Sequence, residues 1–283
     1  MLQILIQGLL LSGLYALIAM GFMLIFSIGR TLNLAYGAYL MVGGYVYFWI
    51  SQQLGLPQVL GFMGAVMIGV LMGLFKHQFI VKPLKENHVA IEISTLILAV
   101  VIQAGIILLF GDSSKILLPI VPGVVRVGGA TVTYSILLAT VISWVIIMSL
   151  YFFVRLTHIG RAMQAVSMDR KGAVISGISS GYINLITWGL SGGLGAIGGA
   201  FFASYTQLSP SMWVAPLIIS VAIVIVGGIG SIIGTLVVAH VIGFLEVIVV
   251  SVFAPELRGV STMLLIITVL ILRPQGLFGR AEN

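Results

Sequence analysis

The feature that most constrains this chain is the length of its uncharged stretches. No Asp, Glu, Lys or Arg lies between Lys171 and Glu246, and shorter uncharged runs cover 1–29, 31–75, 93–111, 127–154 and 259–272. A hydrocarbon core about 30 Å thick is crossed by about 20 apolar residues of helix, so these runs supply roughly eight or nine crossings. They lack the alternation of a β-barrel, and backbone groups in lipid must be hydrogen-bonded internally. The sequence therefore predicts an all-α polytopic membrane protein, with residues 1–283 in one transmembrane domain.

The composition agrees with a lipid environment. The 283 residues are 60% hydrophobic and 7% charged, whereas a soluble domain has about 25% charged residues. We assign the net charge of +6 to basic cytoplasmic loops and not to nucleic-acid binding. The N-terminus lacks a basic leader region and its apolar run is too long for a cleaved signal, so it should remain as the first span.

Nine apolar segments are expected to be helical, at 4–28, 33–50, 58–80, 90–110, 132–154, 183–204, 214–228, 232–253 and 259–272. Glycines interrupt 33–50 and 214–228, which could be re-entrant, so a count of eight spans stays open. Alternation places three basic clusters on one side, and the positive-inside rule makes that side, with the C-terminus, cytoplasmic. These clusters are Lys76, Lys82 and Lys85; the 155–171 segment; and Arg273 and Arg280. The loop 111–131 is then the main external segment.

The segment 155–181 carries Arg155, Arg161, Asp169, Arg170 and Lys171 between two apolar stretches. Its apolar residues recur at roughly helical intervals, which predicts an amphipathic helix with Ala173 and Gly177 on one face. Such a helix could lie on the membrane surface. It could instead be a coupling helix that seats in a groove on a cytosolic motor.

Glycine-rich segments have two interpretations. Small residues let helices approach closely in membranes, which explains most of the 35 glycines. However, three glycines within Gly227–Ser231 weaken a helix by about 1 kcal/mol each, which favours a break. Broken helices line substrate pathways in transporters. We therefore expect the Asn33–Tyr45 and Gly227–Ser231 segments to lie at a central path.

Catalytic patterns are missing from the sequence. The histidines His77, His88, His158 and His240 have no metal-binding spacing, and there is no phosphate-binding loop and no nucleophile elbow. Because the chain also lacks cysteine, we expect no catalytic residue, no metal and no cofactor here. If ATP is used, another chain binds it. Glu246 lies within the eighth span, where a carboxylate is a functional candidate, but a structural role stays open.

Three motifs resemble those of branched-chain amino acid ABC transporter permeases of the LivH type. They are GRAMQAV at 160–166 with its continuation to Ile178, NLAYG at 33–37 followed by GGY at 43–45, and RPQGLFG at 273–279. The likeness runs over essentially the whole chain. Two departures occur: the family often has histidine, glycine and glutamate where this chain has Tyr36, Gly37 and Ala38, and Glu-Ala-Ala where it has 171–173.

The resemblance implies a transmembrane subunit of an ABC importer, in a prokaryotic inner membrane, for branched-chain or related small amino acids. Partners would be a second permease of the LivM type, two cytosolic ATPases that hold ATP and Mg, and an external substrate-binding protein. The departure at Tyr36 leaves urea or short amides open as substrates. An ion-coupled secondary carrier is the alternative from another class.

Two sets of residues are thus nominated. The ATPase-coupling set, implied by the resemblance, is Gly160, Arg161, Met163, Asp169, Arg170, Ala173, Gly177 and Ile178. The translocation-pathway set, which follows the glycine interruptions, is Asn33, Tyr36, Gly37, Gly43, Gly44, Gly227, Gly228, Gly230 and Ser231.

Overall fold

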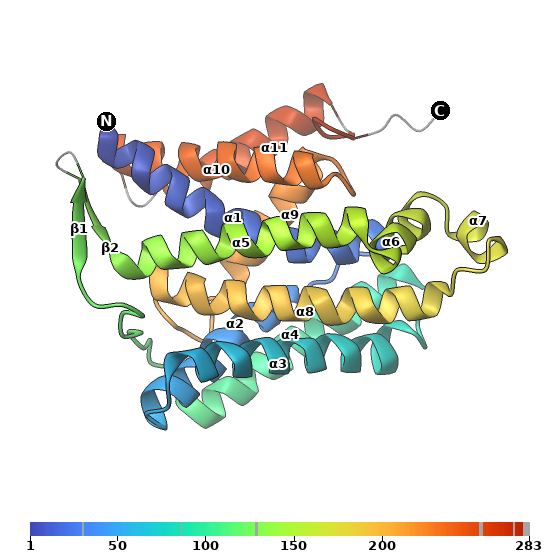
Figure 1. The fold of residues 1–283 in the computed structure, drawn as a ribbon, viewed down its shortest axis with the longest axis horizontal. Helices are drawn as coiled ribbons and strands as arrows, with labels where there is room; N and C mark the ends of the chain where they lie inside the picture. The colour runs from blue at the N-terminus through green and yellow to red at the C-terminus, as the bar shows by residue number, and fades with distance from the viewer. Residues whose placement is uncertain (30, 86, 128–129, 255–256, 274, 280–283) are drawn as a thin grey trace.

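The computed structural model is a bundle of long helices with a β-hairpin at one end and two short helices at the other (Figure 1). It describes residues 1–29, 31–85, 87–127, 130–254, 257–273 and 275–279. The α-helices of these residues are α1 (Leu2–Gly29), α2 (Tyr36–Phe48), α3 (Gln58–Lys76), α4 (His88–Phe110), α5 (Tyr134–Leu156), α6 (His158–Met168), α7 (Arg170–Ile175), α8 (Ser180–Tyr205), α9 (Val214–Gly227), α10 (Ile232–Val252) and α11 (Val260–Leu272). Short π-helices, η1 (Trp49–Gln53) and η2 (His77–Val81), extend α2 and α3. We call the two ends of the bundle the hairpin end and the α6 end.

The helices confirm an all-α polytopic fold. Six helical segments are long and apolar enough to cross a membrane: α1, α3 with η2, α4, α5, α8 and α10. Helices α2 and α9 have 13 and 14 residues, fewer than the roughly 20 that a crossing needs. The two segments that glycine interrupts in the sequence thus form helices too short to cross a membrane alone. The chain is a multi-pass membrane protein.

Helix α1 is the centre of the bundle. In its most apolar stretch 89% of the residues are buried, against 17% for α4. A helix that is covered on all sides must be apolar all round, and α1 has no charged residue. By contrast, α3 and α4 expose large apolar side chains such as Met67, Ile97 and Leu108. These exposed faces suit contact with lipid.

Glycines on α2 and α3 allow these helices to approach α8 closely. A Cβ at Gly43 would overlap the backbone of Ala196, and one at Gly73 would overlap the carbonyl of Trp188. The expectation that Gly43 and Gly44 interrupt their helix is wrong, because α2 continues through both. Close packing offsets the low helix propensity of glycine in such positions.

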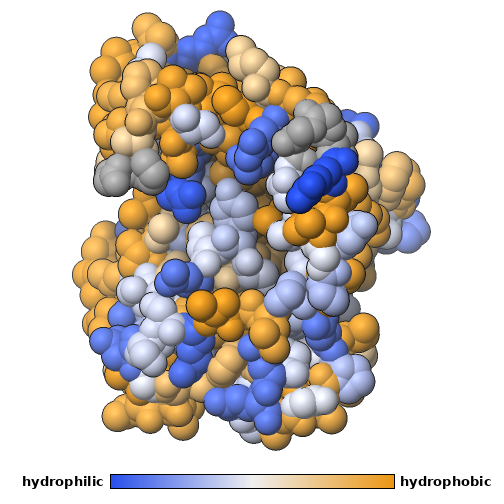
Figure 2. Space-filling view, turned by 90° about the vertical axis from the view of Figure 1, so that its left-hand side faces the viewer, coloured by the Kyte–Doolittle hydropathy of each residue, from blue (hydrophilic) through white to orange (hydrophobic). Residues whose placement is uncertain are grey.

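The hairpin end carries most of the irregular structure. Strand β1 (Val124–Val127) pairs antiparallel with β2 (Ala130–Thr133), a hairpin that the sequence analysis did not predict within the loop 111–131. The same loop is tied to the segment after α8, because Lys115 and Leu208 exchange backbone hydrogen bonds of 2.8 and 3.0 Å. Hydrophilic residues gather on this end, whereas the flanks are mostly hydrophobic (Figure 2).

Candidate coupling face and translocation pathway

The charged segment 155–181 forms two helices and not one. Thr157 begins α6 by accepting a hydrogen bond from the Gly160 N–H at 3.0 Å. Asp169 ends α6 in extended backbone and begins α7 by accepting from the Lys171 N–H at 2.9 Å. Such caps satisfy backbone donors that the first turn leaves free. The expectation that Ala173 and Gly177 share one helix face is wrong, because α7 ends at Ile175 and Gly177 has a φ of +82°.

The inner face of this segment packs on the bundle. Met163, Val166 and Ala173 are buried in a cluster with Ile28 of α1 and Ile183 of α8. Ile178 packs against the same cluster. A Cβ at Gly160 would collide with the backbone of Phe153 and Val154, so only glycine permits the tight corner between α5 and α6. The segment is therefore packed against the transmembrane helices as part of the fold.

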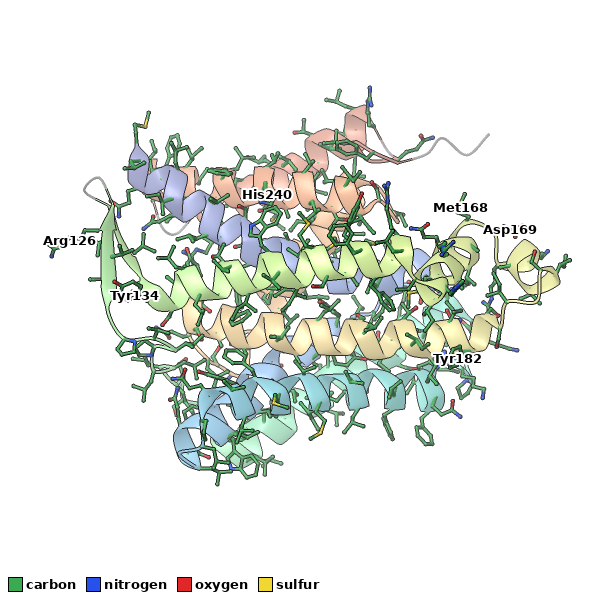
Figure 3. All side chains as sticks on the ribbon, viewed as in Figure 1. Arg126, Tyr134, Met168, Asp169, Tyr182 and His240 are labelled. Atoms are coloured by element: carbon green, nitrogen blue, oxygen red, sulfur yellow. The ribbon has the colours of Figure 1, made fainter. Side chains whose placement is uncertain are left out.

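The outer face forms a tip that projects from the bundle, with Asp169 at its joint (Figure 3). Met168, Val174 and Ile175 are 64%, 52% and 86% exposed at this tip. Arg161, Arg170 and Lys171 are exposed beside them. We call residues 168–177 the α6–α7 tip. A surface that mixes large apolar and charged side chains is suited to binding a protein partner.

A cavity of about 1170 Å³ lies behind the tip at the α6 end. It is open on one side and is lined by the ends of α1 and α5, by α6, by the turn between α9 and α10, and by the C-terminal segment. Its polar lining includes Ser27, Arg155, Gln164, Ser231 and Gln275. The structure thus brings two distant sequence motifs, GRAMQAV and RPQGLFG, to the walls of one cavity. Pro274 and Arg280 lie outside the described residues.

The Gly227–Ser231 segment is a turn at the α6 end. Gly228 and Gly230 have φ values of +93° and +79°, a region that favours glycine, and Ser231 caps α10 by accepting from the Gly234 N–H at 3.0 Å. Gly227 packs on Gly234, and Gly228 packs on the backbone of Phe278 and Gly279. Gly230 and Ser231 line the cavity, whereas Gly227 does not.

The Asn33–Tyr45 segment is packed inside the bundle from Tyr36 onward. The Tyr36 hydroxyl donates to the Ile18 carbonyl at 2.7 Å. A Cβ at Gly37 would meet the Trp213 backbone, and one at Gly44 would meet Leu208. Together with Gly43, these residues form helix contacts around α2. They do not line the cavity at the α6 end.

A buried lysine was missed by the sequence analysis, which placed Lys76 in a cytoplasmic basic cluster with Lys82 and Lys85. Lys76 is 0% exposed. Its ammonium donates to the Asn33 side-chain oxygen and lies 5.0 Å from the Trp188 ring centroid and 5.6 Å from that of Tyr39. A sequence cannot distinguish such a lysine from one that extends to the interface from a helix end.

Asn33 belongs to a loop that side chains anchor from two other helices. Besides the contact with Lys76 of α3, the Leu32 N–H donates to Glu92 of α4 at 3.4 Å and the Leu34 N–H donates to Thr95 at 3.1 Å. Backbone groups buried in a membrane protein need such partners. The loop between α1 and α2 is thus a fixed polar joint.

Glu246 lies deep between α1 and α10. It is 1% exposed, accepts a hydrogen bond from the Tyr15 hydroxyl at 2.9 Å and lies 3.6 Å from Nε of Arg258. His240, near the middle of α10 (Figure 3), contacts the Leu236 carbonyl and the Trp144 ring instead. The two residues therefore lie in separate environments, as their spacing predicts.

Comparisons with known proteins agree along the whole chain. The BraD permease protein of the Pseudomonas aeruginosa high-affinity branched-chain amino acid transport system is 27% identical, over 99% of this chain and 96% of that protein. The LivH permease protein of Escherichia coli K12 is 26% identical with the same coverage. The probable LivH permease protein of Methanocaldococcus jannaschii is 25% identical, over 98% of this chain and 92% of that protein. No solved structure matches the chain.

The family model described as branched-chain amino acid transport system, permease component, matches residues 4–271. This range covers nearly the whole chain, including the α6–α7 tip and the joint at Asn33. The chain therefore belongs to the family of permease components of branched-chain amino acid transport systems.

Proposed function

We propose that this chain is a transmembrane subunit of an ABC importer that translocates branched-chain or related small amino acids. The family and the names of the relatives support the substrate class. The observation that carries the proposal is the α6–α7 tip, whose outer face presents Ile175 at 86% exposure and whose inner face is seated on α1 and α8. With this geometry, a movement of a soluble ATPase bound to the outer face would be transmitted to α1 and α8.

The tip is the docking site for one of two cytosolic ATPases, and the second permease of the complex docks the other. Exposed Met168, Val174 and Ile175 enter a groove on the motor, and Arg170 and Lys171 pair with acidic groups at its rim. ATP and Mg belong to the motor, and this chain holds no cofactor. Motor closure moves α6, which displaces α1 and α8 through the cluster around Met163. Small shifts of this kind are amplified where packing is bistable.

The α6 end is cytoplasmic in this proposal. Lys82, Lys85, Arg161, Arg170 and Lys171 are exposed at or beside it, and cytoplasmic loops carry an excess of basic residues. The hairpin end then faces outward and receives an external substrate-binding protein. The second permease of the complex is a related chain of the LivM type, and nucleic acid plays no part.

Uptake by the reconstituted complex tests the substrate class. Proteoliposomes with both permeases, the ATPases and the binding protein should accumulate labelled leucine or isoleucine only when ATP is supplied to the ATPase side. The proteoliposomes should show no ATP-dependent uptake of urea or acetamide. ATP-dependent uptake of urea or acetamide without leucine uptake would replace the amino-acid assignment, and leucine uptake driven by an ion gradient without ATP would replace the importer class.

A further inference from the structure

A second, smaller pocket lies at the hairpin end, remote from the cavity behind the α6–α7 tip. Its volume is about 150 Å³. A single water requires about 10–15 Å³ of such free space, so the pocket admits about ten non-hydrogen atoms, the size of leucine. Its walls come from α1, α10, the end of α8 and the segment before α11, and consist of Gln7, Leu11, Tyr205, Glu246, Val247, Val250, Ser251 and Arg258.

The charges in this pocket are only partly satisfied. One oxygen of Glu246, Oε1, accepts from Tyr15 and faces Arg258 at 3.6 Å. The other, Oε2, is buried and has no hydrogen-bond partner among the described residues. Buried carboxylate oxygens are normally hydrogen-bonded. Among the described residues, the protein therefore supplies no donor to this oxygen.

Within the part of the chain that the structure describes, Arg258 is also incompletely paired. Its side chain is 50% exposed and its Nε is 3.6 Å from Glu246, longer than the usual limit of about 3.2 Å for an N–H···O hydrogen bond. A guanidinium has five N–H donors in a fork that matches a carboxylate. Because Arg258 repels metal ions and other simple cations from the pocket, the arrangement favours a ligand that carries both charges.

Building on the proposed importer function, we propose that this pocket binds an α-amino acid on its outer side before translocation. The ligand's ammonium donates to Glu246, and its carboxylate pairs with Arg258 at the mouth. The aliphatic side chain lies against Leu11, Val247 and Val250. This places a zwitterion-selective site in the permease itself, between the external binding protein and the inner path.

Cysteine protection tests the site without requiring transport. Ser251 is exposed and lines the pocket, and the chain has no cysteine of its own. In nucleotide-free membranes that contain the whole complex, a Ser251→Cys variant is labelled with an impermeant thiol reagent. Leucine at tenfold its Kd, about 10 mM for a weak site with a Kd of about 1 mM, should slow labelling about tenfold. Isocaproate, which lacks the amino group, and isoamylamine, which lacks the carboxylate, should not.

Three variants complete the test. Ser113→Cys, at the same end but outside the pocket, should be labelled at a rate that leucine does not change. Adding Glu246→Gln to Ser251→Cys should abolish protection, whereas adding Asp112→Asn, an exposed carboxylate at the same end but outside the pocket, should preserve it. If Glu246→Gln does not fold, the comparison of leucine with its two analogues still decides. Equal labelling with and without leucine, up to its solubility limit, overturns the site while ATP-driven leucine uptake would still support the importer.

Discussion

At Lys76 a lysine side chain lies fully buried inside the helix bundle, its amino group held by Asn33 and faced by two aromatic rings. Burial of an ammonium costs several kcal/mol, and contacts with aromatic faces return about 2 kcal/mol when desolvated. Among the described residues, no carboxylate lies within ion-pair distance of this lysine. The aliphatic stem of Lys76 fills space in the core, whereas burial of the charged form of its amino group destabilises the fold. Substitution can separate these two contributions.

Lys76→Met keeps the length of the side chain and removes the charge, so the free energy of unfolding should stay equal or rise. Lys76→Ala also removes the charge but leaves a cavity, which should cost about 2–5 kcal/mol. Thermal unfolding of both variants in detergent compares them. If the methionine variant loses as much stability as the alanine variant, the charge and its bond to Asn33 contribute to folding, and the volume argument is wrong.

At the scale of helices, contact between α2 and α8 depends on missing side chains. Gly43→Ala places a methyl group on the Ala196 backbone, and overpacking of this kind costs about 1–3 kcal/mol. Gly105 of α4 is the matched control, because a Cβ there meets nothing within 4 Å. Gly105→Ala should therefore be neutral or stabilise by up to about 1 kcal/mol through helix propensity.

Membrane yield and melting temperature measure both glycine variants. The account expects a lower yield and melting temperature for Gly43→Ala and no loss for Gly105→Ala. Equal behaviour of the two would show that glycine at 43 serves a purpose other than close packing, such as a place in the path.

Apolar run length predicted every span to within a few residues, because lipid enforces helix wherever about 20 apolar residues occur. Three local features escaped prediction. The break at Asp169 depends on one capping side chain within a helical pattern. The hairpin at 124–133 consists of two four-residue strands, too short for their alternation to stand out. Continuity of α2 through Gly43 depends on α8, which lies about 150 residues later in the chain.

The candidate sites were predicted less completely than the fold. The tip residues followed from charge, since Arg170 and Lys171 interrupt an apolar chain. The sequence could not predict that the GRAMQAV and RPQGLFG segments line one cavity, because no pattern in either segment indicates that the two are close in space. The position of Arg258 beside Glu246 was missed for the same reason: Glu246 lies in α10, whereas Arg258 lies in the connection between α10 and α11.

For the whole molecule, the two ends carry different features. The α6 end joins the exposed tip, the cavity of about 1170 Å³ and the anchored joint at Asn33. The hairpin end holds the pocket at Glu246. Helix α1 contacts both regions, with Tyr15 at Glu246 and Ile28 beside α6. A shift of α1 driven from the tip would therefore reach the outer pocket.

The most direct test of the account is the effect of a charge at the tip on coupling. In the reconstituted complex, Ile175→Asp should abolish ATP-driven leucine uptake and reduce co-purification of the ATPases at least tenfold, because a carboxylate cannot enter an apolar groove without a large desolvation cost. Ile116→Asp, at the hairpin end and 81% exposed, should fold, assemble and retain coupling to the ATPases. An Ile175→Asp complex that holds its ATPases and transports leucine at the normal rate would contradict the coupling role of the α6–α7 tip.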